Sequence, residues 1–552
     1  MTADLWYRNA IVYSLDVETF ADANGDGVGD FEGLIRRLDY LETLGVDAIW
    51  LAPFQPSPDR DDGYDITDFY GVDPRYGSSG DFVEFMREAT SRGIRVVMDL
   101  VLNHTSDRHP WFQSARKDPS SRWRDWYVWS ETKPKYPKQG MVFPGFQEST
   151  WTYDDAARAW YYHRFYDFQP DLNVENPHVR EEMRRVMAYW IALGVAGFRV
   201  DAVPFVLEHT DPRRREAAKD FEILYDLRRV ADLRAGDALL LGEANVEPKE
   251  QLPYFGKRGE GIQMMFNFWV NQHLFLALAT SDVRPLAAAL RATRSIPKGA
   301  QWAQFLRNHD ELDLGRLTEE QRRTIFARFA PDERMHLYDR GIRRRLAPML
   351  GDRRHLELAY SLLFSLPGTP VIRYGDEIGM GDDLSLPQRD AVRTPMQWSD
   401  EPQAGFTTAD DAPHPVIADD GPWDYRRVNV EAQQRDPSSL LRWTAHMIRV
   451  RKQCPEIGRG TWTLLATGKP EVIAMRYDWR GSSVVVVHNL ADHPRAVRLR
   501  PGVEGGDVLV SLLHEEKSRA RADGSHALAL DAFGYAWYRV GGLNYALRRE
   551  RE

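Results

Sequence analysis

The sequence contains little cysteine and no long apolar run. Cys454 is the one cysteine among 552 residues, so no disulfide can form within the chain. No stretch reaches the roughly 20 consecutive apolar residues that a membrane-spanning helix needs. Residues 1–8 also lack the apolar core of a signal peptide. We therefore expect a cytoplasmic protein that does not associate with a membrane.

The sequence also lacks an excess of basic charge. Lys and Arg number 72 against 82 Asp and Glu, which gives a formal net charge of −10. Proteins that bind nucleic acids usually carry a basic stripe, because they displace counterions from phosphates. The arginine triplets at 213–215 and 343–345 stand among acidic and helical patterns, and we interpret them as solvated helix faces. A nucleic-acid partner is therefore not expected.

Short apolar runs alternate with amphipathic helical stretches over most of the chain. Hydrophobic residues make up 43% of it, which is enough for a large core. Strands are predicted at 48–52, 94–102, 197–200, 238–241, 304–306 and 370–374, and helices at 31–44, 79–91, 177–193 and 353–365. Continuous apolar runs indicate parallel strands that are covered on both faces. The pattern predicts an α/β fold, either a doubly wound sheet or a closed (β/α)8 barrel.

Two regions depart from this alternation. Residues 103–172 are rich in Trp, Tyr, Pro and Ser with little helical period, and a connection of that length predicts a subdomain over one end of the barrel. Short alternating strands at 472–477, 483–489, 496–499, 508–513, 527–530 and 534–540 are typical of an antiparallel β-sandwich. We predict a catalytic barrel at 1–102 and 173–458, an inserted subdomain at 103–172 and a β-sandwich at 459–552.

Four predicted strands end in polar clusters, at 99–104, 199–201, 243–245 and 308–311. In a barrel, the C-terminal strand ends meet on one face, which would bring Asp201, Glu243 and Asp310 together. Retaining glycoside cleavage needs a carboxylate nucleophile and a protonated carboxylic acid roughly 5 Å apart. Arg199 shares a strand face with Asp201, so we expect it to hold that carboxylate ionised. Any one of these acids could be a helix cap or a solvated loop residue, but together they predict a catalytic site.

These four clusters, in this order, resemble the signature regions of the α-amylase superfamily, glycoside hydrolase family 13. The resemblance extends from Tyr7 to the C-terminus. It implies a TIM barrel, with the inserted subdomain after the third strand and a C-terminal β-sandwich. It makes Asp201 the nucleophile, Glu243 the general acid/base and Asp310 the stabiliser of the transition state. No cofactor is expected for the chemistry.

The resemblance also implies which residues bind the sugar. The −1 subsite would hold one glucose with His104, Arg199 and His309. Residues 62–65 resemble the segment that supplies an aromatic platform, Tyr64, and an acid, Asp65, at the non-reducing end. Arg389 matches the arginine that pairs with this acid in exo-acting members, and such a bridge would favour disaccharides over long glucans. Tyr64 alone could also be an ordinary core aromatic residue.

Two structural calcium sites are predicted. The loop at 22–30 places oxygen ligands at alternate positions, which suits a hard cation, although the distal glutamate of an EF-hand is absent. It resembles the first-loop calcium site of oligosaccharide-cleaving relatives, and an acidic turn without metal is the alternative. Its ligands would be Asp22, Asn24, Asp26, Val28 and Asp30. The second site rests on the resemblance alone and would use Asn103, Asp171, Glu208 and the backbone carbonyls of Phe205 and Val206.

Within the family, the chain is most similar to the trehalose synthase group, which isomerises maltose and trehalose by turning the released glucose inside a closed pocket. The similarity lies at 56–65, 104–112, 305–312, 341–348 and 374–381. The chain departs from that group at 208–215, where a Cys-Glu-Asn-Leu-Pro stretch is missing. Because this segment lies near the active-site rim, the acceptor stays open: glucose, water, another sugar or a non-sugar alcohol.

The expected substrates are small α-glucosides, namely maltose, trehalose, sucrose or short maltooligosaccharides. The expected reaction is isomerisation or α-glucosyl transfer through a covalent glucosyl-enzyme. An exo-acting α-glucosidase is the alternative. A non-catalytic member, like the heavy chains of amino-acid transporters, is disfavoured because Asp201, Glu243 and Asp310 are all present. Assembly into a homo-oligomer is left open by the sequence.

Overall fold

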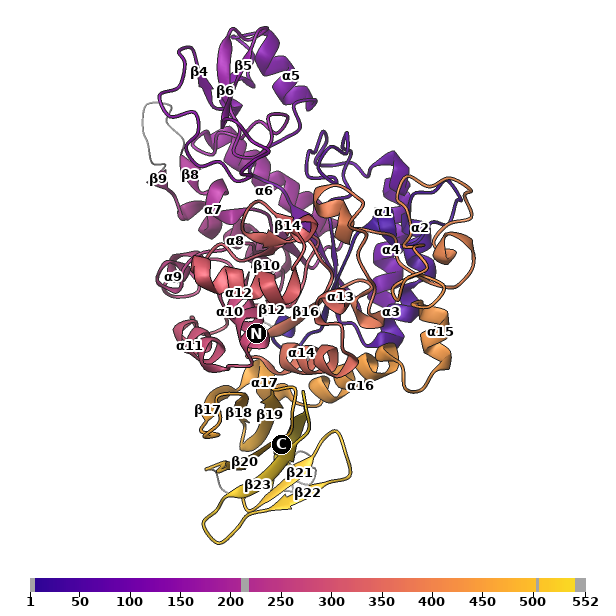
Figure 1. Cartoon of the computed structure of the whole chain (residues 1–552). Helices are drawn as coiled ribbons and strands as arrows, with labels where there is room; N and C mark the ends of the chain where they lie inside the picture. Colours follow the sequence, from indigo (N-terminus) through magenta and orange to yellow (C-terminus); the bar gives the residue numbers. More distant parts are fainter. Residues whose placement is uncertain (1–4, 210–217, 503–505, 542–552) are drawn as a thin grey trace.

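Eight parallel strands close into a barrel at the centre of the molecule (Figure 1). The computed structural model describes residues 5–209, 218–502 and 506–541. In chain order the barrel strands are β1 (Val12–Leu15), β2 (Ala48–Leu51), β3 (Arg95–Leu100), β7 (Gly197–Val200), β10 (Leu239–Gly242), β11 (Met264–Phe266), β12 (Gln301–Phe305) and β16 (Thr369–Arg373). The last strand, β16, pairs with β1 and closes the ring. The predicted TIM barrel is confirmed, and the doubly wound sheet is excluded.

Helices lie around the barrel and in the loops that connect its strands. They include α1 (Val17–Phe20), α2 (Phe31–Arg36), α3 (Leu38–Leu44), α4 (Ser79–Ser91), α6 (Pro177–Ala192), α7 (Val203–Val206), α8 (Glu222–Ala235), α9 (Pro248–Phe255), α10 (Phe268–Thr280), α11 (Arg284–Ala292), α12 (Glu319–Phe329), α13 (Leu346–Leu350), α14 (Arg353–Ser365), α15 (Val430–Arg435), α16 (Leu440–Lys452) and α17 (Pro455–Arg459). The helix predicted at 31–44 is two helices, because Arg37 leaves helical geometry with φ −104° and ψ 3°. Short strands β8 (Glu208–His209), β9 (Ala218–Lys219), β13 (Leu312–Asp313), β14 (His336–Leu337) and β15 (Gly341–Ile342) lie in the connecting loops.

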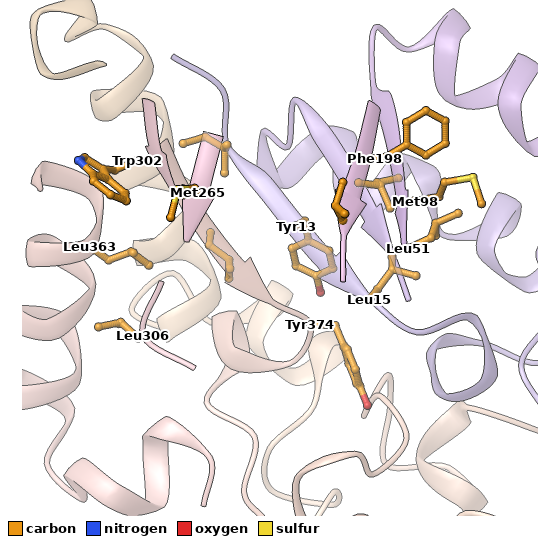
Figure 2. Packing of buried hydrophobic residues seen from close by; sticks show 14 of the residues in the cluster. Tyr13, Leu15, Leu51, Met98, Phe198, Met265, Trp302, Leu306, Leu363 and Tyr374 are labelled. Carbon is orange, nitrogen blue, oxygen red and sulfur yellow. The ribbon is translucent and has the colours of Figure 1, made fainter. Parts of the chain in front are cut away.

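Side chains of the barrel strands alternate between two apolar cores. Outward-facing residues such as Tyr13, Met98 and Phe198 pack against the helices (Figure 2). Inward-facing residues such as Trp50 and Phe266 fill the barrel itself. Successive strand residues point to opposite sides, so the inward set continues in polar residues where the strands end. The charged residues of the active site therefore lie next to the apolar core inside the barrel, at the C-terminal ends of the strands.

The segment between β3 and α6 forms a small structure of its own over one end of the barrel (Figure 1). It contains α5 (Pro110–Lys117) and an antiparallel sheet in the order β4 (Trp129–Ser130), β6 (Ala159–Tyr162), β5 (Trp151–Asp154). A bridge between His104 and Asp171 joins its two ends beside β3. The insertion therefore stands over the C-terminal strand ends, while its bounds at 103 and 172 stay predictions.

The C-terminal region is an antiparallel β-sandwich at the opposite end of the molecule (Figure 1). One sheet has the order β17 (Thr461–Leu465), β18 (Val472–Trp479), β19 (Ser482–Asn489), β24 (Tyr535–Val540), β21 (Val508–Ser511), β22 (Lys517–Arg519). The other sheet pairs β20 (Arg495–Leu499) with β23 (His526–Leu530). Val485 from the first sheet and Val497 and Leu528 from the second share one core. The predicted sandwich is confirmed, and its start at residue 459 stays a prediction.

One of the two arginine triplets is buried rather than solvated. Arg345 is 1% exposed, and its Nη1 donates to the carbonyl of Tyr374 at 2.8 Å. The interpretation of 343–345 as a helix face is therefore wrong, because these residues precede α13 and support the loop after β16. Residues 213–215 lie outside the described residues. None of the helices in the described ranges combines the length and the apolar character needed to cross a membrane.

The barrel and the sandwich are joined by a buried ion pair, which gives a first testable prediction. Arg539 Nη1 lies 2.6 Å from Glu456 Oε1, and the Glu456 side chain is fully buried. Replacing Glu456 with Ala removes this buried anionic partner of the guanidinium, so we expect the free energy of unfolding to fall by roughly 3 kcal/mol. Differential scanning calorimetry would measure it. Glu431→Ala, which breaks an exposed pair with Arg435, is the control and should change stability by less than about 1 kcal/mol.

Candidate active site

A single buried arginine gathers the catalytic carboxylates. Arg199 lies on β7 and is 1% exposed. Its guanidinium contacts Asp99 Oδ1 at 2.5 Å, Asp201 Oδ1 at 2.5 Å and Glu243 Oε2 at 2.9 Å. Trp50 Nε1 donates to the other oxygen of Asp99 at 2.9 Å. Asp201 and Glu243 therefore lie side by side across one guanidinium, as the paired carboxyl groups of a retaining glycosidase require.

These carboxyl groups line a cavity of about 580 Å³, within the range of small-molecule sites. Its wall combines residues from the barrel loops and from the insertion. Most of the predicted sugar-binding and catalytic residues meet there: Tyr64, His104, Asp201, Glu243, His309, Asp310 and Arg389. Arg199 lies behind Asp201 and Glu243, which places it as a support of the cavity floor.

The two catalytic candidates differ in protonation. Burial raises the pKa of Glu243 to about 7, and the nearby charges of Asp201 and Asp310 add to this effect. Burial also raises the pKa of Asp201 to about 6, although Arg199 opposes it. The contact with Arg199 is as predicted, but burial outweighs its charge. Near neutral pH, Asp201 is therefore mostly ionised while much of Glu243 keeps its proton, which suits a nucleophile and a general acid.

Asp310 is held as an anion by two arginines. Arg389 Nη1 lies 3.0 Å and Arg393 Nη2 3.2 Å from Asp310 Oδ1. Burial alone would raise the pKa of Asp310, but the charges of Arg389 and Arg393 bring it below its usual range. Such a fixed negative charge can stabilise the positive charge that develops on a sugar ring in the transition state.

Neutral polar groups line the wall around this charge. Tyr64 Oη lies 2.9 Å from His309 Nε2, and the two rings are stacked with centroids 5.7 Å apart. His104 Nε2 lies 3.1 Å from the backbone carbonyl of Tyr64. Burial lowers the pKa of His104 to about 4 and that of His309 well below its ordinary value. Both imidazoles are therefore neutral at neutral pH.

The predicted ion pair between Asp65 and Arg389 is wrong. Asp65 is fully buried, and it accepts hydrogen bonds from Ser57 Oγ at 2.9 Å and Arg60 Nε at 3.3 Å. These contacts hold the side chain of Asp65 in the turn at 57–60. Arg389 instead pairs with Asp310 and with Glu311 Oε2 at 2.8 Å.

Asp61 lines the cavity in the place expected for Asp65. Gln169 Nε2 donates to Asp61 Oδ2 at 2.8 Å. Burial raises the pKa of Asp61 to about 6, against the opposing charges of Arg389 and Arg393. Arg389 is therefore near an acid of the cavity, as predicted. This acid is Asp61, four positions before the predicted Asp65.

Other cavity residues were not predicted. Glu311 and Asp61 stand inside the motifs at 305–312 and 56–65, so their neighbours in sequence could have indicated them. Outside the cavity lining, Arg393, which pairs with Asp310, was also missed, although it directly precedes the Thr394-Pro395 pair that follows Arg389. Phe143 reaches the cavity from the insertion, where the sequence gives no periodic signal.

The loop at 22–30 satisfies its own acidic groups. Asp22 accepts backbone N–H groups of Gly25 and Gly27 at 2.7 and 2.8 Å, and Asp30 accepts those of Ala23 and Asn24. Asp26 accepts the N–H of Val28. The ranges described here contain no group of three or more His, Cys, Asp or Glu side chains placed to hold a metal ion. The oxygen donors suit calcium in kind, and its presence stays a proposal.

The second predicted metal site stays a prediction, because the structure brings Asn103, Asp171 and Glu208 together but engages them with protein groups. The guanidinium of Arg164 contacts Glu208, and its backbone N–H donates to Asp171 at 2.9 Å. The side-chain amide of Asn103 faces His104. The carbonyl of Phe205 accepts the N–H of Leu207, and Val206 lies in α7 with its side chain buried. A protein cation already occupies the position beside Glu208 that the metal would need. Of the unusual segment 208–215, residues 210–215 lie outside the described residues.

Comparisons with known proteins show the family to which the chain belongs. Residues 16–331 and 342–460 match the α-amylase catalytic domain family, and residues 481–539 match the C-terminal domain of sucrose hydrolase-like proteins. The chain belongs to the α-amylase family, and it is an enzyme that acts on α-glucosides.

Its relatives include trehalose synthases. That of Thermus thermophilus is 45% identical over 541 residues, covering 97% of this chain and 55% of that protein. That of Pimelobacter sp. (strain R48) is 41% identical over 549 residues, covering 97% of this chain and 96% of that protein. The chain thus spans about half of the Thermus relative and nearly all of the other.

Among solved structures, the trehalulose synthase MutB of Pseudomonas mesoacidophila, in complex with its substrate sucrose, has a TM-score of 0.78 and 25% identity. The match covers 97% of this chain and 99% of that one.

The two pKa values predict a bell-shaped pH profile. Activity should rise through about pH 6 as Asp201 loses its proton and fall through about pH 7 as Glu243 loses its own. The measurement is kcat/KM for an aryl α-glucoside between pH 4 and 9. In Glu243→Gln, which cannot ionise, the falling limb should disappear. A falling limb that persists in this variant would show that another group supplies the proton.

Proposed function

We propose that the protein isomerises maltose and trehalose by intramolecular α-glucosyl transfer. The observation that carries this proposal is the pairing of an ionised Asp201 with a protonated Glu243 on Arg199 in a cavity of about 580 Å³. The likeness to trehalose synthases over nearly the whole chain supports isomerisation as the outcome. Hydrolysis of short α-glucosides is the second candidate, because water can attack the same intermediate.

In the first step, an oxygen of Asp201 attacks the anomeric carbon of the bound glucosyl unit. The bond from that carbon to the glycosidic oxygen breaks, and Glu243 gives its proton to the leaving oxygen. The negative charge of Asp310 stabilises the oxocarbenium-like transition state, and it persists through the reaction because two arginines hold it. The products are a covalent glucosyl-enzyme and one free glucose.

In the second step, the freed glucose turns and presents its anomeric hydroxyl. Glu243, now ionised, takes the proton of that hydroxyl. The hydroxyl oxygen then attacks the anomeric carbon of the glucosyl-enzyme. The bond to Asp201 breaks, which restores the carboxylate and gives an α,α-linked disaccharide. Two inversions retain the α configuration. If the freed glucose stays in the cavity, maltose therefore becomes trehalose. If water enters and attacks instead, the products are two glucose molecules.

Product analysis by NMR tests this proposal. We expect purified protein to convert maltose to trehalose, and trehalose to maltose, with little free glucose. Asp201→Ala should stop turnover without changing the circular dichroism spectrum, since covalent catalysis needs the nucleophile. Asp155→Asn, an exposed acid on the insertion, is the control with unchanged activity. Free glucose as the sole product would establish a hydrolase instead.

We further propose that calcium binds the loop at 22–30 as a structural ion. The support is the oxygen-rich sequence, which suits a hard cation. Calcium should raise the midpoint of thermal unfolding of EDTA-treated protein, and Asp26→Ala should remove most of that increase. An identical midpoint with calcium and with EDTA would contradict the site. The cytoplasmic location and a homo-oligomeric state stay predictions.

A further inference from the structure

A short segment of the insertion, residues 140–143, lies along the cavity, and we call it the cover segment. All four of its residues line the cavity. The carbonyl of Gly140 accepts a hydrogen bond from Arg164 Nη1 at 3.0 Å, and the carbonyl of Val142 accepts one from Arg340 Nη2 at 3.0 Å. Both arginines line the same cavity. The cover segment is therefore held at two points by the walls of the active site.

The two arginines anchor the cover segment to different parts of the barrel. Arg164 contacts Glu208, in the loop that follows the nucleophile strand β7. Arg340 Nε lies 3.4 Å from Asp313, three residues after Asp310. Gly140 has a φ of +78°, and a Cβ there would lie 1.9 Å from Arg164 Nη1. A side chain at this position would push Arg164 away, so the close contact depends on glycine.

The last residue of the cover segment, Phe143, makes aromatic contacts. The ring of Phe143 lies 4.9 Å from that of Tyr338 and 4.7 Å from that of Tyr166, measured between centroids. The guanidinium of Arg389 lies 5.3 Å from the Phe143 ring and 5.5 Å from the Tyr338 ring. Arg389 also pairs with Asp310. It therefore contacts both the aromatic pair and a catalytic carboxylate.

We propose that the cover segment, through the contact between Phe143 and Tyr338, determines whether the glucosyl group goes to the retained glucose or to water. This inference rests on the proposed function. In both outcomes the bond between Asp201 and the anomeric carbon breaks, and Glu243 takes a proton from the attacking hydroxyl. The outcomes differ only in whether that hydroxyl belongs to the retained glucose or to a water molecule. An apolar cover favours the first, because it slows both the loss of glucose and the entry of water.

The test is the product ratio of Phe143→Ala with maltose as substrate and 13C-labelled glucose in the medium. Opening the cover should raise the ratio of free glucose to trehalose by roughly three- to tenfold, the range that loss of one aromatic contact spans. Labelled glucose should also enter trehalose, since the released glucose then exchanges with the medium. Both quantities are ratios of products, so a smaller amount of folded enzyme does not change them.

Two further variants separate the cover from general damage. Arg340→Gln removes the donor to Val142 while leaving the aromatic contact, and it should shift the ratio in the same direction even if Phe143→Ala folds poorly. Tyr153→Ala, 45% exposed on the same insertion, should leave the ratio unchanged. The inference would be overturned if both Phe143→Ala and Arg340→Gln kept the wild-type ratio of free glucose to trehalose and let no more labelled glucose into trehalose than the wild type does. If the wild-type protein forms no trehalose from maltose, the proposed function itself fails, and the cover has no isomerisation to protect.

Discussion

The active site depends on one buried cation, the guanidinium of Arg199. An isolated charge in a protein interior is strongly unfavourable, so its position is acceptable only with anionic partners. Asp99, Asp201 and Glu243 provide them from three strand ends. Asp99 and Arg199 are opposite each other in the register of β3 and β7. The barrel that aligns these strands thus also sets the spacing of the two catalytic carboxyl groups, and an error in register would separate them.

The same cation does not neutralise the site. Burial and mutual repulsion raise the pKa of Glu243 from 4.5 to about 7, so the folded protein binds its proton more tightly than the unfolded chain does. By linkage, the contribution of this group to stability falls as the pH rises through that window and is lowest above pH 7. The protonated acid that glycosidic cleavage needs is therefore maintained at the expense of stability. Asp310 shows the opposite balance, because two arginines outweigh its burial.

The sequence predicted the parts of this arrangement that local patterns encode. Apolar runs located six barrel strands, whereas β1 and β11 were missed, because Ser14 interrupts the apolar run of β1 and β11 has three residues. Motif order located Asp201, Glu243 and Asp310. The error at Asp65 arose because its partners Ser57 and Arg60 lie in the turn at 57–60, and a motif in such a turn does not show which way each side chain points. Arg164, whose guanidinium lies beside the second predicted metal site, contacts Glu208 44 positions later, and no local rule gives such a pairing.

Whether the freed glucose stays in the cavity or leaves it depends on which residues form the cavity. The barrel supplies a floor of fixed charges, and that floor serves isomerisation and hydrolysis equally, since both pass through one glucosyl-enzyme. The wall that could distinguish them is assembled from the insertion and from the loops at 204–208 and 338–340, which are remote in sequence. Side chains that bind a common intermediate cannot by themselves select its acceptor. Selection must therefore depend on the residues that control access, and these belong to the irregular segments where sequence patterns are weakest.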